Sequence, residues 1–348
     1  MNSETHLHWA EEKEVVHSNK PVKLLIKLIA HLPNFIVNIL IFPVGFFYFV
    51  FSKRARNECS RYQNQFIEYT KNLKNFNASA DPNTNTSTNN KSEQNREVVK
   101  ISVVRPLRQI ISFSLCILEK IEGWSKKIPL EHISFYEEVE KLIEHLESGR
   151  GAFLIGSHLG NTELLRSLAA IRKTGVDREI EVTVIMENAA TQNFSKTIQD
   201  MFPDSKMNVI DAASIGAETI IFLEEQLEKG GMIVATGDRT SAHSKNRFLK
   251  NDFLGKEAAF PYGVFLLAYL LKASVFFFFA LRKKDITLFP KYNMYVHSAK
   301  TNFLDATRSN KEEKIKRLCK EFTNYLEKYC LRYPFQWYNF YDFWASEN

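Results

Sequence analysis

The chain has 348 residues, of which 45% are hydrophobic and 25% are charged, and it carries a formal net charge of +6. The hydrophobic share supports a packed core and excludes a wholly disordered chain, while the charged share excludes a protein made mostly of membrane spans. The length predicts one large domain or two ordinary ones, and the positive charge favours anionic partners such as phospholipid surfaces, acidic carrier proteins or nucleic acid.

The first 22 residues are polar and mixed in charge. Glu4, Glu11 and Glu12 precede any apolar run, whereas a secretory signal peptide begins with a short basic region followed by an apolar one. We therefore predict a polar N-terminal segment over 1–22 and no signal peptide.

An apolar segment follows, and we predict that residues 23–52 anchor the protein in a membrane. Phe35 to Phe51 contain no charge, and an extension back to Ile29 makes the run long enough to cross a hydrocarbon layer of ~30 Å. Basic residues flank it on both sides so similarly that they set no orientation. Pro33 and Pro43 interrupt a straight span, so a kinked or interfacial helix is one alternative, and a buried core helix is another.

Residues 53–100 combine a polar helix over 57–75 with a low-complexity tract over 76–97. The tract is rich in Asn, Ser and Thr, and such a composition buries too little apolar surface to order itself. We predict a flexible surface loop there.

Residues 101–348 are predicted to form an α/β domain. A helix is expected over 101–125, and Ser134-Phe-Tyr-Glu137 has the pattern of a capping box, which predicts the start of a helix that ends at Gly149. Short apolar runs then alternate with helical segments, as in a mostly parallel sheet flanked by helices. The predicted strands are 152–156, 181–186, 207–210, 232–236, 275–281 and 294–297, and the predicted helices are 161–171, 193–201, 215–227, 261–271 and 311–330.

Ligands of open α/β sheets gather at the carboxyl ends of the strands, where the first strand is followed by His158 and Glu163. A carboxylate that accepts the His Nδ1–H fixes the tautomer and makes Nε2 a better base. This HX4E spacing therefore predicts a catalytic pair that can take a proton from a hydroxyl. The alternative is structural: His158 caps the following helix and Glu163 interacts with the helix dipole.

The strand at 232–236 is followed by Gly237-Asp238-Arg239. An Arg at a strand end can bind a carboxylate or phosphate while the Asp anchors a loop, although a structural ion pair would use the same residues. Farther along, Gly255 suits a close backbone approach and Pro261 suits the first turn of a helix. That apolar helix either walls a channel for an acyl chain or is simply buried.

These motifs resemble the bacterial lipid A biosynthesis acyltransferases, the lauroyl and myristoyl transferases, over nearly the whole chain. The resemblance rests on the HX4E motif, on Gly237-Asp238-Arg239-Thr240, on the segment 253–263, and on a C-terminal Tyr333-Pro334-Phe-Gln336-Trp337. The aromatic-rich ending also resembles a side branch associated with aryl polyene or xanthomonadin pigment genes.

The resemblance implies a glycerolipid acyltransferase-like fold and an enzyme at the cytoplasmic face of the bacterial inner membrane. It would move an acyl group from acyl carrier protein or coenzyme A to a hydroxyl of a lipid, with membrane phospholipid around it and no further cofactor. His158 would be the general base and Glu163 its orienting partner. The candidates for substrate binding are Asn161, Arg166, Asp238, Arg239, Gly255 and Pro261.

One departure from the family concerns the acceptor. Many relatives carry an Arg after the strand that ends at Met186, whereas this chain has Glu187-Asn188-Ala189. If that Arg binds an anionic lipid A precursor, this protein uses a different acceptor.

Two other functions remain open. One is metal-dependent lipid hydrolysis, with His158 and Glu163 as ligands and a third ligand from His243, His297 or Asp238, although none has a recognised metal spacing. The other is a membrane protein that binds acyl carrier protein without catalysis. The basic residues are scattered without a nucleic-acid-binding motif, so we expect no nucleic acid. The four cysteines are widely spaced and predict neither a disulfide framework nor a zinc site.

Overall fold

A computed structural model describes residues 34–80, 91–124, 128–162, 176–187, 207–240 and 247–344, together with Leu32 and Leu164. The polar N-terminal segment 1–22, the predicted helix at 193–201 and most of the predicted helix at 161–171 lie outside the described residues.

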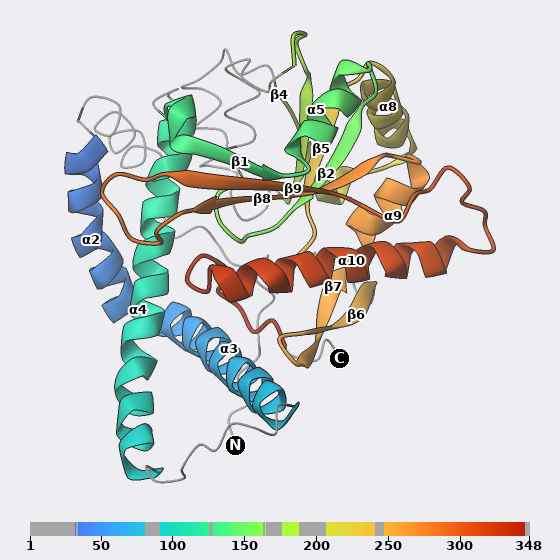
Figure 1. Ribbon diagram of the computed structural model, residues 1–348. Coiled ribbons are helices and arrows are strands. Elements are labelled where there is room, and N and C mark those ends of the chain that lie inside the picture. The colour runs from blue at the N-terminus through green and yellow to red at the C-terminus, as the bar shows by residue number, and fades with distance from the viewer. Residues whose placement is uncertain are drawn as a thin grey trace.

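A seven-stranded sheet forms the centre of the molecule (Figure 1). The strand order is β1-β9-β8-β2-β5-β3-β4, and the pairs that adjoin each other are parallel except β8 with β9. The mostly parallel sheet predicted from the sequence is therefore confirmed. The strands are β1 (Ile133–Glu137), β2 (Ala152–Gly156), β3 (Val182–Met186), β4 (Met207–Asp211), β5 (Met232–Thr236), β8 (Val275–Arg282) and β9 (Tyr292–Ser298).

Helices cover both faces of the sheet, because the side chains of each buried strand alternate between the two faces. From β8, Phe277 and Phe279 pack with one core cluster and Phe276 and Phe278 with another. The first cluster contains residues of α8, α9 and α10, and the second contains residues of α5. The helices are α2 (Asn34–Phe51), α3 (Lys53–Ala80), α4 (Lys91–Trp124), α5 (Val139–Glu147), α8 (Ala217–Glu228), α9 (Tyr262–Leu270) and α10 (Lys311–Arg332).

The capping-box prediction at Ser134–Glu137 is wrong, because these residues belong to β1. They pair with β9 in parallel, with Ser134 opposite Asn293 and Glu137 opposite Val296. Pairing with a strand more than 150 residues away satisfies the backbone groups that a local cap would otherwise satisfy. The helix itself exists, but it begins at Val139.

An antiparallel hairpin of β6 (Phe248–Phe253) and β7 (Lys256–Pro261) is present that the sequence patterns do not predict. Its turn places Leu254 at φ 50° and Gly255 at φ 77°. A Cβ on Gly255 would lie 2.9 Å from the Tyr69 ring of α3, so the close approach and the left-handed backbone both require glycine here. Pro261 ends β7 and directly precedes α9.

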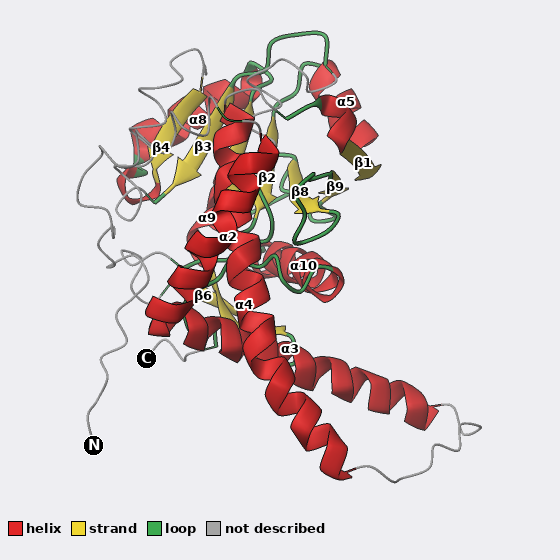
Figure 2. Ribbon diagram, turned by 90° about the vertical axis from the view of Figure 1, so that its left-hand side faces the viewer, coloured by secondary structure: helices red, strands yellow, loops and turns green. Residues whose placement is uncertain are grey.

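The flexible loop predicted over 76–97 is only partly a loop. The structure continues α3 to Ala80 and begins α4 at Lys91, and the residues between them lie outside the described part of the chain. Figure 2 shows α3 and α4 as long helices that extend together beyond the rest of the molecule. Adding a residue to an existing helix costs far less than starting one, so a polar composition does not end these helices.

The predicted membrane anchor corresponds to α2, which has 18 residues with Pro43 inside and lies along α4 (Figure 2). Among the described residues, no single helix is long and apolar enough to cross a membrane. One pair of helices, Phe35–Phe51 with Lys53–Leu73, reaches the required length and apolar composition when taken together, and this pair is bent by 92°.

The four cysteines are free and buried. A buried ion pair instead joins α4 to the sheet: Arg282 Nε, at the end of β8, lies 2.8 Å from Glu119 Oε1, and both side chains are 3% exposed or less. Burial raises the pKa of Glu119 against the opposing attraction of Arg282.

Replacement of Arg282 by Met should destabilise the protein by about 3–5 kcal/mol, because it leaves the Glu119 carboxylate buried without a countercharge. The matched control is Lys250→Met, which breaks the exposed pair with Glu257 and should cost at most about 1 kcal/mol. Thermal unfolding of the purified protein in detergent compares the two. Equal shifts in Tm would contradict the structural role of the buried pair.

Candidate active site

The candidate site lies where β2 and β5 end side by side. Gly156, the last residue of β2, is in register with Thr236, the last residue of β5, and Gly237 N donates to Gly156 O at 2.9 Å. His158 and Asp238 each follow two residues later. Because the two strands are parallel and in register, equal offsets bring the two side chains together.

His158 and Asp238 form a hydrogen-bonded pair. The Nδ1 atom of His158 lies 2.8 Å from Asp238 Oδ1, and the backbone N–H of His158 donates to Asp238 Oδ2 at 2.8 Å. A carboxylate at Nδ1 assigns the ring proton to that nitrogen, which leaves Nε2 with a free lone pair. The geometry is that of a general base held by a buried carboxylate.

The C-terminal segment completes the support of this pair. Trp337 Nε1 donates to Asp238 Oδ2 at 3.0 Å. Backbone bonds join the same segment to the loop after β2: Tyr338 N donates to His158 O at 2.9 Å, and Gly160 N donates to Gln336 O at 2.8 Å. The loop that carries His158 is therefore held between β5 and the C-terminal segment.

Glycine at position 160 follows from the packing of this loop. Gly160 has φ 79°, and a Cβ there would lie 2.1 Å from Ala280 O of β8. A side chain would thus be excluded by the backbone of the neighbouring strand as well as by the left-handed conformation. The glycine lets the chain turn tightly after His158.

The two members of the pair differ in exposure and in electrostatics. The His158 side chain is 29% exposed, whereas Asp238 is fully buried. Burial lowers the pKa of His158, and the positive charges of Arg239 and Lys120 add to that effect against the opposing attraction of Asp238. Burial alone would raise the pKa of Asp238, but the His158 ring, its hydrogen bonds and Arg239 hold that pKa below its usual value. The lowered pKa of His158 favours the neutral imidazole, which is the form that a general base requires.

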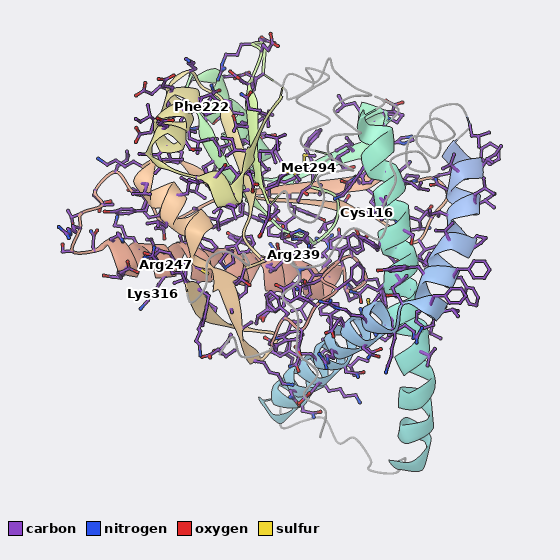
Figure 3. All side chains as sticks on the ribbon, turned by 180° about the vertical axis from the view of Figure 1, so that it is seen from behind. Cys116, Phe222, Arg239, Arg247, Met294 and Lys316 are labelled. Atoms are coloured by element: carbon purple, nitrogen blue, oxygen red, sulfur yellow. The ribbon has the colours of Figure 1, made fainter. Side chains whose placement is uncertain are left out.

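Arg239 lies close to the centre of the molecule (Figure 3). Its Nη2 donates to Tyr338 O at 2.8 Å, so it also fastens the C-terminal segment. Its attraction to Asp238 opposes the lowering of its pKa by burial. Asp238 and Arg239 each bond a backbone group, at His158 N and Tyr338 O, and the charges of both act on the pKa of the imidazole.

The other predicted site residues are placed as follows. Asn161 is 3% exposed; its backbone N donates to Ala280 O at 2.8 Å, and no residue in the described part of the chain bonds its side-chain amide. Gly255 contacts Tyr69 in the hairpin turn described above, which accounts for it by packing. Glu163 and Arg166 lie outside the described residues.

The sequence predicts that Glu163 accepts from His158 Nδ1, whereas the carboxylate at Nδ1 in the structure is Asp238. Trp337 is part of the C-terminal motif, and the sequence predicts no role for it. His158 and Asp238 each lie two residues after the end of a predicted strand. This equal offset predicts that the two side chains meet only if β2 and β5 are known to be neighbours in the sheet. Nothing in the sequence placed Trp337 beside Asp238.

The described residues contain no cluster of three or more metal-binding side chains. Both oxygens of Asp238 accept hydrogen bonds from protein groups, and His297 Nε2 lies 2.7 Å from the Tyr329 hydroxyl. Both groups are thus already hydrogen-bonded within the protein. His243, the other candidate ligand, lies outside the described residues.

Comparison with known proteins bears on what this pair does. The sequence model of a family described as bacterial lipid A biosynthesis acyltransferase matches residues 34–345. No curated protein matches the chain. The matched region contains α2, the whole sheet, His158 with Asp238, and the C-terminal segment that holds them. The chain therefore belongs to the bacterial lipid A biosynthesis acyltransferases and is an acyltransferase.

Proposed function

We propose that the protein transfers a fatty acyl group from the thioester of acyl carrier protein or coenzyme A to a hydroxyl of a lipid acceptor, with His158 as the general base. The observation that carries this proposal is the His158–Asp238 pair at the carboxyl ends of β2 and β5. The positive net charge suits an acidic carrier protein as donor.

In the proposed reaction His158 Nε2 takes the proton of the acceptor hydroxyl as the oxygen attacks the thioester carbonyl. The carbonyl oxygen becomes negative in the tetrahedral intermediate, and collapse of the intermediate forms the ester and breaks the carbon–sulfur bond. The proton then passes from the imidazolium to the leaving thiolate. Asp238 keeps the ring oriented and stabilises the imidazolium, and the Arg239 charge favours the negative intermediate.

Glu163 remains in the proposal as a second catalytic carboxylate, on the strength of the family resemblance. Since Asp238 occupies Nδ1 of His158, Glu163 would act at another point of the reaction. The acceptor is proposed to be a lipid A precursor or a related glycolipid, including the aryl polyene lipids of the side branch.

We also propose that α2 holds the enzyme on the bacterial inner membrane, with the catalytic domain on the cytoplasmic side. The helix exposes at least half of the surface of three aromatic residues, Phe46, Phe47 and Phe51, and Phe51 is 80% exposed. Lys53 and Arg54 follow directly, so a basic flank adjoins the apolar face. Burial of such a face in the lipid interface removes apolar surface from water and places the cations near phosphates.

Loss of His158 tests the base assignment. Transfer of labelled acyl chains by purified protein should fall by about 10²–10⁴-fold in His158→Ala, because the hydroxyl loses its proton acceptor. Asp238→Asn should also reduce turnover strongly, because the Asn cannot balance the imidazolium. Glu163→Gln is expected to slow transfer as well. His132→Ala, a histidine outside the site, is the control, and Tm shows whether each variant folds. Normal turnover in folded His158→Ala would end the assignment.

The pH profile tests the electrostatics of the site. Because Arg239 lowers the pKa of His158, Arg239→Met should raise that pKa and move the acidic limb of kcat/KM to higher pH. Arg239→Lys keeps the charge and should keep the limb close to its original position. Superimposable profiles for wild type and Arg239→Met would show that the titrating group is not His158 beside Arg239.

Vesicle binding tests the membrane surface. The double variant Phe47→Asp/Phe51→Asp should bind anionic phospholipid vesicles at least about tenfold more weakly, because charged groups replace apolar rings that enter the interface. Leu304→Asp is the matched control, because Leu304 is also 80% exposed but lies away from α2, before α10. Sedimentation with vesicles measures both, and an equal loss in the two would contradict a specific role for α2.

A further inference from the structure

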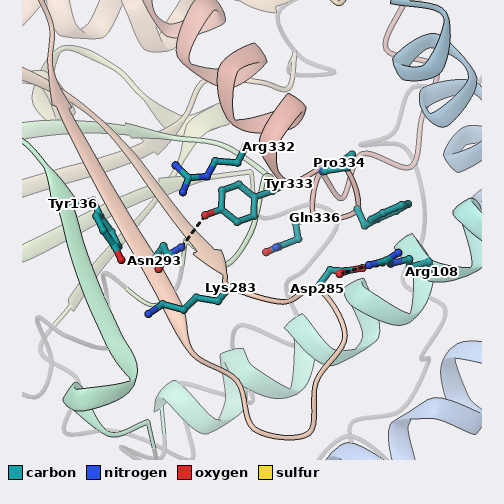
Figure 4. Close-up of a pocket in the computed structure, with 10 residues that line it drawn as sticks. Arg108, Tyr136, Lys283, Asp285, Asn293, Arg332, Tyr333, Pro334 and Gln336 are labelled. Carbon is teal, nitrogen blue, oxygen red and sulfur yellow. Dashed lines mark hydrogen bonds and ion pairs between the residues drawn. The ribbon is translucent and has the colours of Figure 1, made fainter. Parts of the chain in front are cut away.

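A pocket of about 530 Å³ lies at the end of the sheet where β8 leads into β9 (Figure 4). Its wall comes from β1, α4, the β8–β9 loop and the turn that follows α10. Figure 4 shows Lys283 and Arg332 reaching toward the space beside Asn293, with Tyr136 across from them. The lining is strongly polar and contains three cations and one carboxylate.

The single carboxylate of the pocket is already paired. Asp285 Oδ2 and Oδ1 accept from Arg108 Nε at 2.5 Å and Arg108 Nη2 at 2.8 Å, a bidentate bond that uses the charge of both residues. Two cations of the lining, Lys283 and Arg332, therefore remain without a carboxylate among the residues that line the pocket.

Both remaining cations are held by neutral groups. Lys283 Nζ donates to Ser134 Oγ at 2.9 Å, and the Arg332 guanidinium lies 5.5 and 5.6 Å from the ring centres of Tyr295 and Tyr333. Neutral partners orient a cation without neutralising it. The pocket consequently keeps two cations without a countercharge among its lining residues, and both are exposed to solvent at its mouth.

A buried polar network forms the floor. Asn293 is 7% exposed, its Nδ2 donates to Tyr333 Oη at 2.8 Å, and its Oδ1 has no partner among the described residues. Tyr333 Oη lies 2.7 Å from Tyr295 Oη. An unpaired buried amide oxygen is costly, and it is explained if a hydrogen-bond donor of a bound ligand completes the network.

We propose that this pocket binds the phosphate ester of the lipid acceptor, an inference that rests on the proposed function. Two cations without carboxylate partners, with neutral hydrogen-bonding groups around them, suit the negatively charged oxygens of a phosphate. The volume exceeds that of a bare phosphate and falls in the range of pockets for small organic ligands, so it also accommodates the hydroxylated group attached to the phosphate.

The surroundings favour a lipid over a soluble phosphate. The β8–β9 loop that supplies Lys283 also carries Phe289, which is 73% exposed. The same loop contacts α2, since Asn38 Nδ2 donates to Leu288 O at 2.9 Å. A phosphate in the pocket would therefore lie next to the apolar surface formed by α2 and Phe289, where the acyl chains of its lipid can remain in the membrane.

The pocket also adjoins the loop that carries His158, through Gln336. Gln336 lines the pocket, its Oε1 accepts from Arg282 N at 2.8 Å, and its backbone O accepts from Gly160 N at 2.8 Å. Gly160 is two residues from His158. A lipid held by its phosphate would thus be placed close to the base that activates its hydroxyl.

Isothermal titration of the full-length protein in uncharged detergent tests the site with three probes: dihexanoyl phosphatidic acid, dihexanoylglycerol and inorganic phosphate. The phosphatidic acid should bind more tightly than either of the others. Lys283→Met and Arg332→Met should each weaken its binding about tenfold, the usual effect of losing one charge-assisted hydrogen bond. Lys284→Met, the same change in the neighbouring residue that does not line the pocket, should leave the affinity unchanged.

Three results would overturn the proposal: no binding of the phosphatidic acid to wild type, unchanged affinity in the double variant Lys283→Met/Arg332→Met, or inorganic phosphate binding as tightly as the lipid probe. The last would identify a site for free phosphate. Lys283→Arg/Arg332→Lys, which keeps both charges, should restore binding if the Met variants are folded but weak.

The same titration on His158→Ala separates this inference from the proposed function. Binding needs the pocket but not the base, so His158→Ala should bind the phosphatidic acid as wild type does. If wild type transfers acyl chains while the pocket variants retain lipid affinity, the pocket inference alone fails. If the pocket binds as described while His158→Ala still transfers acyl chains, the base assignment alone fails.

Discussion

One buried carboxylate organises the candidate site. Asp238 has no solvent exposure, and an ionised carboxylate in that environment is stable only when its oxygens accept hydrogen bonds. Its donors come from distant parts of the chain: the ring and backbone of His158 after β2, and the indole of Trp337 near the C-terminus. The loop after β2, the loop after β5 and the C-terminal segment are therefore mutually dependent, and the orientation of the base depends on all three.

The order of the sheet explains how much of this could be predicted from the sequence. The apolar runs at 152–156 and 232–236 were recognisable as buried strands, because burial on both faces leaves a continuous hydrophobic pattern. That β2 lies directly beside β5 is a property of the tertiary fold. Without it, Glu163 was the carboxylate nearest to His158 in sequence, and Asp238, 80 residues away, was assigned to substrate binding instead.

Local patterns failed where distant contacts decide the structure. The Ser134–Glu137 pattern favours a helix start, but parallel pairing with β9 stabilises the extended conformation of this segment more than one helix cap would stabilise a helix. The β6–β7 hairpin lacks a strongly alternating pattern, and its turn depends on Gly255 fitting against Tyr69 of α3. Conversely, α5, α8, α9 and α10 carry their own periodicity or boundary residues, and the predicted helices were confirmed to within a few residues.

The C-terminal segment connects the proposed phosphate pocket to the candidate active site. Tyr333 belongs to the floor of the pocket lined by Lys283 and Arg332, Gln336 bonds both the end of β8 and the loop that carries His158, and Trp337 bonds Asp238. These contacts lie within five consecutive residues, so one short segment sets the separation between the pocket and the imidazole. An acceptor held at the pocket by its phosphate would then be selected by the distance from that phosphate to its reacting hydroxyl. Such a constraint discriminates among lipids of one charge class without any contact to the hydroxyl beyond the base itself.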